Sequence, residues 1–299
     1  MGGMMRNPWL AFVGLMFMAS WGAAASFDGG IDPTFGSSGY SGGSGYVEAR
    51  TESGFYIRPR ANVFKTDQSS GTYKAFYGRI GYDAALFSIG LEGGATPKLN
   101  GYSNASASAD VTFTLKSGGK GTGRLAGPNA RGEVGKWGEG LTRVDVGGAV
   151  GYIAHREDGA GSVPRLILGQ TDLSGFAGVK FFGLRASGQV TKSLYDKTIP
   201  TTAFAQPNTE LVGVRNLISG FPDYSANARL EGSKLIFFSP FISYTHTRFK
   251  LSQASSKALQ FGVGLDLVML NVRAAYQLYD PGGGAPKRNY ATVGASLNF

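Results

Sequence analysis

The chain ends in YATVGASLNF (290–299), and this stretch decides how the rest of the sequence is interpreted. A period of two in hydrophobicity is the pattern of a β-strand with one apolar and one polar face. A chain end in water gains nothing from a bare aromatic ring, so the apolar face of this strand needs a covering. The apolar residues at every second position are Ala291, Val293, Ala295, Leu297 and Phe299.

The same period of two continues along most of the chain beyond residue 52, as in FYIRPRANV (55–63) and LNVRAAYQLY (270–279). No later stretch has the roughly 20 apolar residues that a membrane-spanning helix needs. Short connections alternate with long polar ones such as KTDQSSGTY (65–73) and DPGGGAPKRN (280–289). Short turns at one end and long loops at the other are typical of a transmembrane β-barrel.

We therefore predict an all-β fold, a transmembrane antiparallel up-and-down β-barrel of about twelve strands, with ten to fourteen left open. The glycine-rich stretch 117–140 would be an unusually long turn. The connection 194–222 could plug the lumen or contain a short helix. The expected strands cover 53–65, 72–83, 86–97, 104–116, 141–155, 163–181, 183–193, 223–231, 235–249, 257–267, 270–280 and 289–299.

The N-terminus has the composition of an export signal. Arg6 precedes an apolar run from Trp9 to Ala19, and Ala23–Ala25 is a small-residue cleavage site. The apolar run is shorter than a spanning helix, which favours cleavage over the alternative of an uncleaved anchor. Cleavage would lower the net charge from +9 by one, to +8. The predicted division is a cleaved signal peptide at 1–25, a flexible Gly/Ser linker at 26–52 and the barrel at 53–299.

The bulk composition excludes some chemistry and selects little else. The 47 glycines suit many turns and smooth strands, and the absence of cysteine excludes disulfides, thiolate metal sites and cysteine nucleophiles. The excess of 29 basic over 20 acidic residues permits anionic lipid, anionic solutes or nucleic acid as partners. Aromatic residues cluster near the strand ends, which favours interfacial girdles over a stacking platform, so we expect no nucleic-acid partner.

The spacing of Thr292, Gly294, Leu297 and Phe299 resembles the C-terminal β-signal of bacterial outer-membrane proteins. The resemblance covers only the last strand, and the pattern of the whole chain agrees with it. It implies a location in the bacterial outer membrane, insertion by the barrel-assembly machinery, and contact with outer-membrane lipid and lipopolysaccharide. The alternative is the edge strand of an exported soluble sandwich.

If the apolar parity faces lipid, the opposite parity faces a lumen with seven arginines against five acids, three of which (Asp110, Glu231 and Asp266) fall near strand ends. An arginine-rich lumen predicts a passive channel for small hydrophilic solutes with a preference for anions. The alternative is a non-conducting structural or adhesive barrel whose lumen is closed by Arg–carboxylate pairs. The residues expected to line the lumen are Arg58, Arg60, Arg79, Glu92, Arg143, Asp145, Arg185, Arg229 and Arg273, of which Arg60, Arg79, Arg143 and Arg273 lie toward strand middles and are expected to set the anion preference.

An outer-membrane lipid hydrolase is a third alternative, because barrels of this size include enzymes that use a histidine. The two histidines, His155 and His246, lack the His-x-Ser or Asp-x-His neighbours of those families. The stretch GGKGTG (118–123) lacks the spacing of a phosphate-binding loop. We therefore expect no enzymatic activity and no catalytic, cofactor-binding or metal-binding residues.

Overall fold

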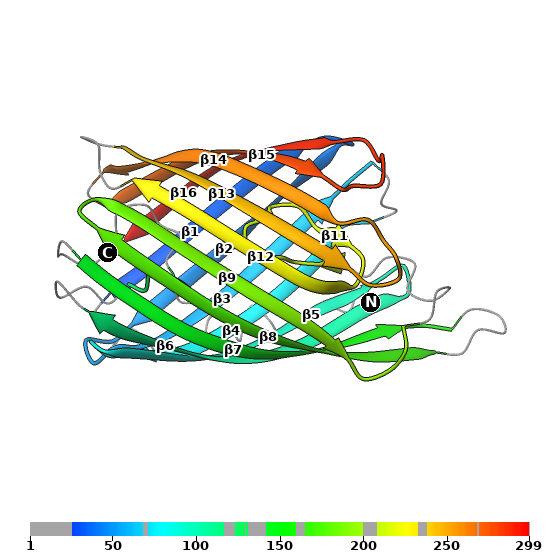
Figure 1. Ribbon diagram of the computed structural model, residues 1–299, viewed down its shortest axis with the longest axis horizontal. Helices are drawn as coiled ribbons and strands as arrows, with labels where there is room; N and C mark the ends of the chain where they lie inside the picture. The colour runs from blue at the N-terminus through cyan, green and yellow to red at the C-terminus, as the bar shows by residue number, and fades with distance from the viewer. Residues whose placement is uncertain are drawn as a thin grey trace, which may run out of the picture.

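The computed structural model describes residues 26–67, 71–116, 123–128, 130, 142–159, 165–199, 208–232, 238–267 and 269–298. The described residues form a closed antiparallel barrel of fourteen strands and a separate two-stranded sheet (Figure 1). The predicted signal peptide at 1–25 lies outside them, and no helix within them is long and apolar enough to cross a membrane. The strands are β1 (Ser26–Gly36), β2 (Tyr40–Arg50), β3 (Phe55–Lys65), β4 (Tyr73–Asp83), β5 (Phe87–Leu99), β6 (Tyr102–Lys116), β7 (Thr142–Glu157), β8 (Leu166–Phe181), β9 (Leu184–Tyr195), β10 (Asn208–Thr209), β11 (Ile218–Ser219), β12 (Pro222–Gly232), β13 (Phe238–Phe249), β14 (Ser256–Leu267), β15 (Leu270–Asp280) and β16 (Arg288–Asn298).

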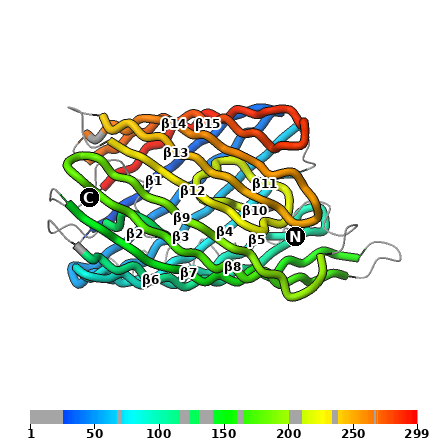
Figure 2. The backbone as a smooth tube through the Cα atoms, viewed as in Figure 1, coloured from blue at the N-terminus to red at the C-terminus, as the bar shows by residue number. Residues whose placement is uncertain are grey.

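Each barrel strand pairs with its neighbours in chain order, and the steep tilt of the strands is visible in both overall views (Figures 1 and 2). The small β10–β11 sheet is inserted in the connection between β9 and β12. Pairing of β1 with β16, with Gly29 opposite Leu297, closes the ring and leaves no free sheet edge. The predicted fold class is confirmed.

Residues 26–52 are not a flexible linker, and this part of the prediction is wrong. They contain β1 and β2, which pair with each other along their whole length and raise the strand number to fourteen. Glycine and serine weaken the alternation here because several glycines sit where a side chain would not fit. A Cβ at Gly30 would overlap Tyr46 and Ser296 across the two neighbouring strands. Ile31 and Phe35 nevertheless point outward, at 63% and 61% exposure.

The outer face of the barrel is apolar and the inner face is polar. Large exposed apolar side chains occur on every barrel strand except β2. Buried polar residues such as Thr112, Gln260 and Thr292 occupy the opposite parity. An apolar outer surface of this extent is stable in lipid, and a closed barrel satisfies its backbone hydrogen bonds without an edge. The chain therefore has the architecture of a transmembrane β-barrel.

The two ends of the barrel differ in their connections. One end has tight turns such as 84–86 and 182–183, whereas the other has longer loops such as 66–72 and 281–287. Short turns face the periplasm in barrels of this type, so we name the two ends periplasmic and extracellular. The long connection 117–141 is the exception at the periplasmic end.

Candidate functional site

The lumen is the candidate functional site, and ion pairs run through it. All seven arginines predicted to line it lie on the inward parity, and each has a carboxylate within 4 Å. The pairs are Arg58–Glu48 at 2.8 Å, Arg60–Glu210 at 3.3 Å, Arg60–Glu92 at 3.7 Å, Arg79–Asp110 at 2.7 Å, Arg143–Asp145 at 2.9 Å, Arg185–Glu231 at 3.7 Å, Arg229–Glu231 at 2.9 Å and Arg273–Asp32, with Nε to Oδ1 at 2.6 Å.

Three of the acids that pair with these arginines were not among the five acids predicted to face the lumen. Asp32 and Glu48 lie on β1 and β2, in the segment taken for a linker, and Glu210 lies in the long connection before β12. Leaving these two segments out of the barrel therefore contributed to the predicted excess of arginines over acids. A usable signal was present in β1, where Asp28, Asp32 and Thr34 share the parity opposite to the apolar residues.

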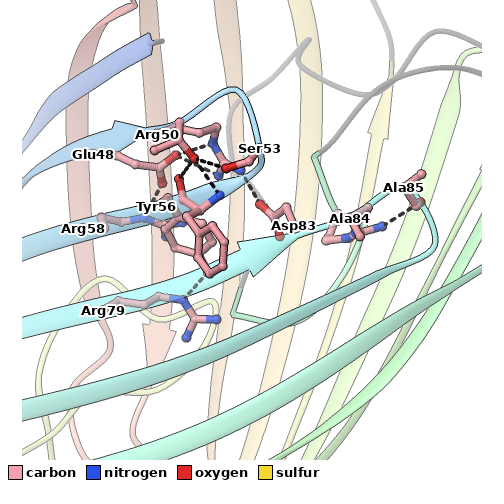
Figure 3. A network of polar contacts seen from close by, with 12 residues as sticks. Glu48, Arg50, Ser53, Tyr56, Arg58, Arg79, Asp83, Ala84 and Ala85 are labelled. Carbon is pink, nitrogen blue, oxygen red and sulfur yellow. Dashed lines mark hydrogen bonds and ion pairs between the residues drawn. The ribbon is translucent and has the colours of Figure 1, made fainter. Parts of the chain in front are cut away.

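At the periplasmic end, β2, β3 and β4 bring together a charged network (Figure 3). Arg50 donates from Nη1 to Asp83 Oδ2 at 2.6 Å and from Nη2 to Glu48 Oε1 at 2.9 Å. The Arg50 guanidinium also stacks on the Tyr56 ring, 4.7 Å from its centroid. The Tyr56 hydroxyl accepts a hydrogen bond of 3.0 Å from Arg79 Nε. These contacts tie three strands together by charge-assisted bonds.

A second periplasmic network includes part of the 117–140 connection. Leu125 is fully buried, and its backbone N–H donates to Asp145 Oδ2 at 2.8 Å. Its carbonyl oxygen accepts from Arg185 Nε at 3.0 Å. Arg124 donates to the Thr114 hydroxyl at 2.6 Å and to the Phe87 carbonyl at 2.5 Å. Residues 123–128 therefore fold against the inner wall and narrow the periplasmic end.

The other long connection enters the lumen from the extracellular side. We call residues 208–219, which include β10 and β11, the lumen loop; its described residues form a hairpin rather than a helix (Figure 1). Glu210 Oε1 accepts a hydrogen bond of 2.5 Å from Asn62 Nδ2. The Arg215 backbone N–H donates to Gln277 Oε1 at 2.8 Å, and its guanidinium lies 3.7 Å from Asp32. Bonds to β1, β3 and β15 hold the loop inside the barrel.

An aromatic cluster anchors the lumen loop at its extracellular side. Leu211, Val214 and Leu217 of the loop pack against inward side chains that include tyrosines from β2, β4, β15 and β16. The ring of Tyr40 meets that of Tyr290 edge-on, with centroids 5.0 Å apart. The loop is thus held by apolar packing on one side and by charged contacts on the other.

A cavity of about 290 Å³ lies beside the lumen loop. Three arginines, Arg60, Arg215 and Arg229, and two acids, Asp32 and Glu210, line it. The rest of the lining is largely hydroxyl and amide side chains of β1, β2, β3, β12, β13 and β14, together with the loop backbone. The site is polar, and its lining holds three basic and two acidic residues.

The two histidines do not form a catalytic arrangement in the described residues. The Tyr102 hydroxyl lies 2.6 Å from Nδ1 of His155, and Gln170 Oε1 lies 3.0 Å from Nε2. Both ring nitrogens of this buried histidine are thus engaged by neutral groups. His246 is half-buried on β13, opposite Ala226 and Lys257.

The residues of the C-terminal motif occupy different environments. The Thr292 hydroxyl lies 2.9 Å from that of Thr34, across the seam where the barrel closes. A Cβ at Gly294 would overlap Asp32 and Arg273, so the glycine has a packing role in the lumen. Leu297 is 44% exposed on the outer face, and Phe299 lies outside the described residues. Recognition of the motif during assembly stays a prediction.

Comparison with known proteins identifies the fold. No protein-family model and no curated protein sequence matches the chain. CdiB from Acinetobacter baumannii is similar in structure with a TM-score of 0.50 at 9% identity, over 92% of this chain and 60% of CdiB. The KdgM porin gives 0.43 at 6% identity, over 92% of this chain and 99% of its own, and the NanC porin gives 0.45 at 8%, over 90% and 98%. The chain spans about 60% of the length of CdiB, and that likeness shows a shared barrel fold alone.

Proposed function

We propose that the protein is a passive outer-membrane channel for small hydrophilic solutes, with a preference for anions. The observation that carries the proposal is the unequal exposure of the partners in three ion pairs of the lumen, Arg58–Glu48, Arg273–Asp32 and Arg215–Asp32. Arg58 and Arg273 are each 20% exposed, and Arg215 is 30% exposed. Their partner carboxylates, on Glu48 and Asp32, are only 4% and 8% exposed.

This asymmetry gives the lumen a positive character even where charges are paired. In these pairs the guanidinium groups are more exposed than the carboxylates that they neutralise. A narrow lumen with low-dielectric walls concentrates the field of such groups and raises the local anion concentration. Arg79 and Arg143, expected from their parity to contribute, are 1% and 4% exposed, so they are not placed to do so.

The competing function is a non-conducting structural or adhesive barrel. The two periplasmic networks, the inward fold of residues 123–128 and the lumen loop all favour it, because each occupies part of the lumen. An outer-membrane hydrolase has less support, since both ring nitrogens of His155 are bonded to a phenol and an amide. We therefore propose a non-enzymatic role in either case.

Planar-bilayer recording of the purified protein distinguishes the two functions. A channel gives ohmic conductance and, under a KCl gradient, a reversal potential displaced toward that of chloride. The displacement should shrink when Arg58 and Arg215 are both changed to glutamine, and it should fade at high salt because exposed charges are screened. Lys287→Gln, in an extracellular loop, is the matched control.

Two results would contradict the proposal. Protein that shows the heat-dependent gel shift of a folded barrel but never conducts favours the closed structural barrel. Equal selectivity in the wild type and in the double variant contradicts the exposure argument for anions.

A further inference from the structure

Two residues that line the lumen cavity each carry a buried amide atom without a hydrogen-bond partner among the described residues. They are Oδ1 of Asn62 and Nε2 of Gln260, on side chains whose residues are 3% and 2% exposed. Both residues line the cavity of about 290 Å³. Buried polar atoms in native proteins are almost always satisfied, because leaving one unpaired costs about 1–3 kcal/mol.

The local bonds fix what Asn62 offers to a ligand. Its Nδ2 already donates to Glu210 Oε1 at 2.5 Å, so the free atom is the carbonyl oxygen, an acceptor. Gln260 presents an amide nitrogen, a donor. A matching ligand therefore carries both a hydrogen-bond donor and an acceptor, as a hydroxyl group does.

The charges around the cavity select the sign of that ligand. The lining holds three arginines and two acids, and two further carboxylates outside the lining, Glu92 and Glu231, pair with Arg60 and Arg229. Arg215 and Arg60 are therefore the cations with exposure enough to meet an anion, at 30% and 33%. Arg60 lies 3.3 Å from Glu210 and 3.7 Å from Glu92, and its guanidinium stands over the Tyr77 ring at 4.1 Å from the centroid. The exposed edge of this planar guanidinium can meet a carboxylate that enters the lumen, and a guanidinium can form two parallel bonds with a carboxylate.

We propose that the cavity is a saturable binding site for a small hydroxylated monocarboxylate. The carboxylate contacts Arg60 and Arg215, a hydroxyl group donates to Asn62 Oδ1, and a ligand oxygen accepts from Gln260 Nε2. The cavity is at the lower limit of the roughly 300–1,000 Å³ typical of small-molecule sites, which restricts it to one small solute. This inference rests on the proposed channel, since the solute must reach the cavity through the lumen.

The test uses the full-length mature protein with sodium gluconate as the probe. Sorbitol carries the same kind of hydroxyl groups without the charge, and acetate carries the charge without hydroxyl groups. Gluconate should block the chloride current with a saturable dependence on concentration, and the other two should block at least tenfold more weakly. Calorimetry on the folded protein in detergent measures the same binding without requiring conductance.

Gln260→Met removes the donor at similar size and should weaken gluconate binding about tenfold, the effect of one hydrogen bond. The matched control is Gln189→Met, because Gln189 faces the lumen on β9 but does not line the cavity. The gel shift of each variant reports whether it folds.

Equal affinity for gluconate and acetate, or equal weakening of gluconate binding by both variants, overturns the binding site while the channel stands. Calorimetric binding of gluconate without any conductance supports the site and contradicts the channel. Conductance with no calorimetric binding contradicts the site alone.

Discussion

The ion pairs at the periplasmic end and those in the middle of the lumen use the same residue types on the same strand parity, yet they differ in burial. Arg79 and Asp110 are each 1% exposed and lie 2.7 Å apart. Arg60 and Glu92 are 33% and 28% exposed and lie 3.7 Å apart. Arg273, on β15 next to the seam, is intermediate at 20% exposure. We call the buried Arg79–Asp110 pair the dry pair and the partly exposed Arg60–Glu92 pair the wet pair.

The difference separates structural charges from charges that can meet a solute. A buried ion pair is costly to form and still more costly to break, because the remaining charge has no water to solvate it. A half-exposed pair contributes little stability and is free to rearrange. The periplasmic arginines therefore hold the barrel wall together, and the mid-lumen arginines are available to passing anions.

The largest effect is expected from breaking the buried pair. Asp110→Asn leaves the Arg79 guanidinium buried without its counter-charge and should lower the free energy of unfolding by about 3–5 kcal/mol. Urea unfolding in detergent micelles measures it. Replacing both residues, as Arg79→Met with Asp110→Leu, should recover most of the loss. The control is Asp223→Asn, whose lysine partners, Lys192 and Lys250, are 46% and 39% exposed. An equal loss in that control would remove the distinction between dry and wet pairs.

A smaller loss is expected at the seam. The added methyl of Gly294→Ala would press on Asp32 and Arg273 and should cost about 1–3 kcal/mol, as overpacking does. Refolding from urea into detergent, without any assembly machinery, isolates this packing effect. Gly175→Ala is the control, because a Cβ at Gly175 meets no atom within 4 Å. If the Gly294 variant were as stable as the wild type, the packing role of this glycine would be contradicted, and only the role in assembly would be left.

The wet pair should tolerate substitution. Arg60→Gln is expected to change the free energy of unfolding by less than about 1 kcal/mol, because its partners are half-exposed. The same unfolding experiment gives the value. A loss as large as that of Asp110→Asn would show that Arg60 is a structural residue and would weaken the proposed channel.

The smallest effect on the finished barrel is expected from Phe299→Ala. If the terminal phenylalanine is read by the barrel-assembly machinery, the variant should insert more slowly in cells while its unfolding free energy stays close to the wild type. Pulse-chase labelling of outer-membrane fractions measures the insertion rate. Val293→Ala, an exposed apolar change on the same strand, is the control. Equal insertion rates for wild type and both variants would contradict the assembly role.

The fold was predictable from β3 onward because successive side chains of a barrel strand alternate between the lipid-facing and the lumen-facing side. In β16, from Ala291 to Leu297, small or apolar residues outside alternate with Thr292, Gly294 and Ser296 inside, and the predicted strand lies close to the observed one. The first two strands were missed because glycines at close approaches, such as Gly30 and Gly42, carry no side chain to reveal the parity. The inward parity of the lumen arginines was equally readable, since parity depends only on position along a strand.

The sequence by itself determined the all-β barrel, its apolar exterior and the identity of the inward charges, because each of these follows from alternation within single strands. Only the tertiary structure decided which carboxylate meets which arginine and how much water reaches each pair. Those contacts join residues far apart in the chain, such as Asp32 with Arg273 and Arg60 with Glu210, across a closed ring and an inserted loop. A periodic pattern specifies the face on which a side chain lies, whereas its partner and its burial depend on where the ring closes and on which segments fold inside.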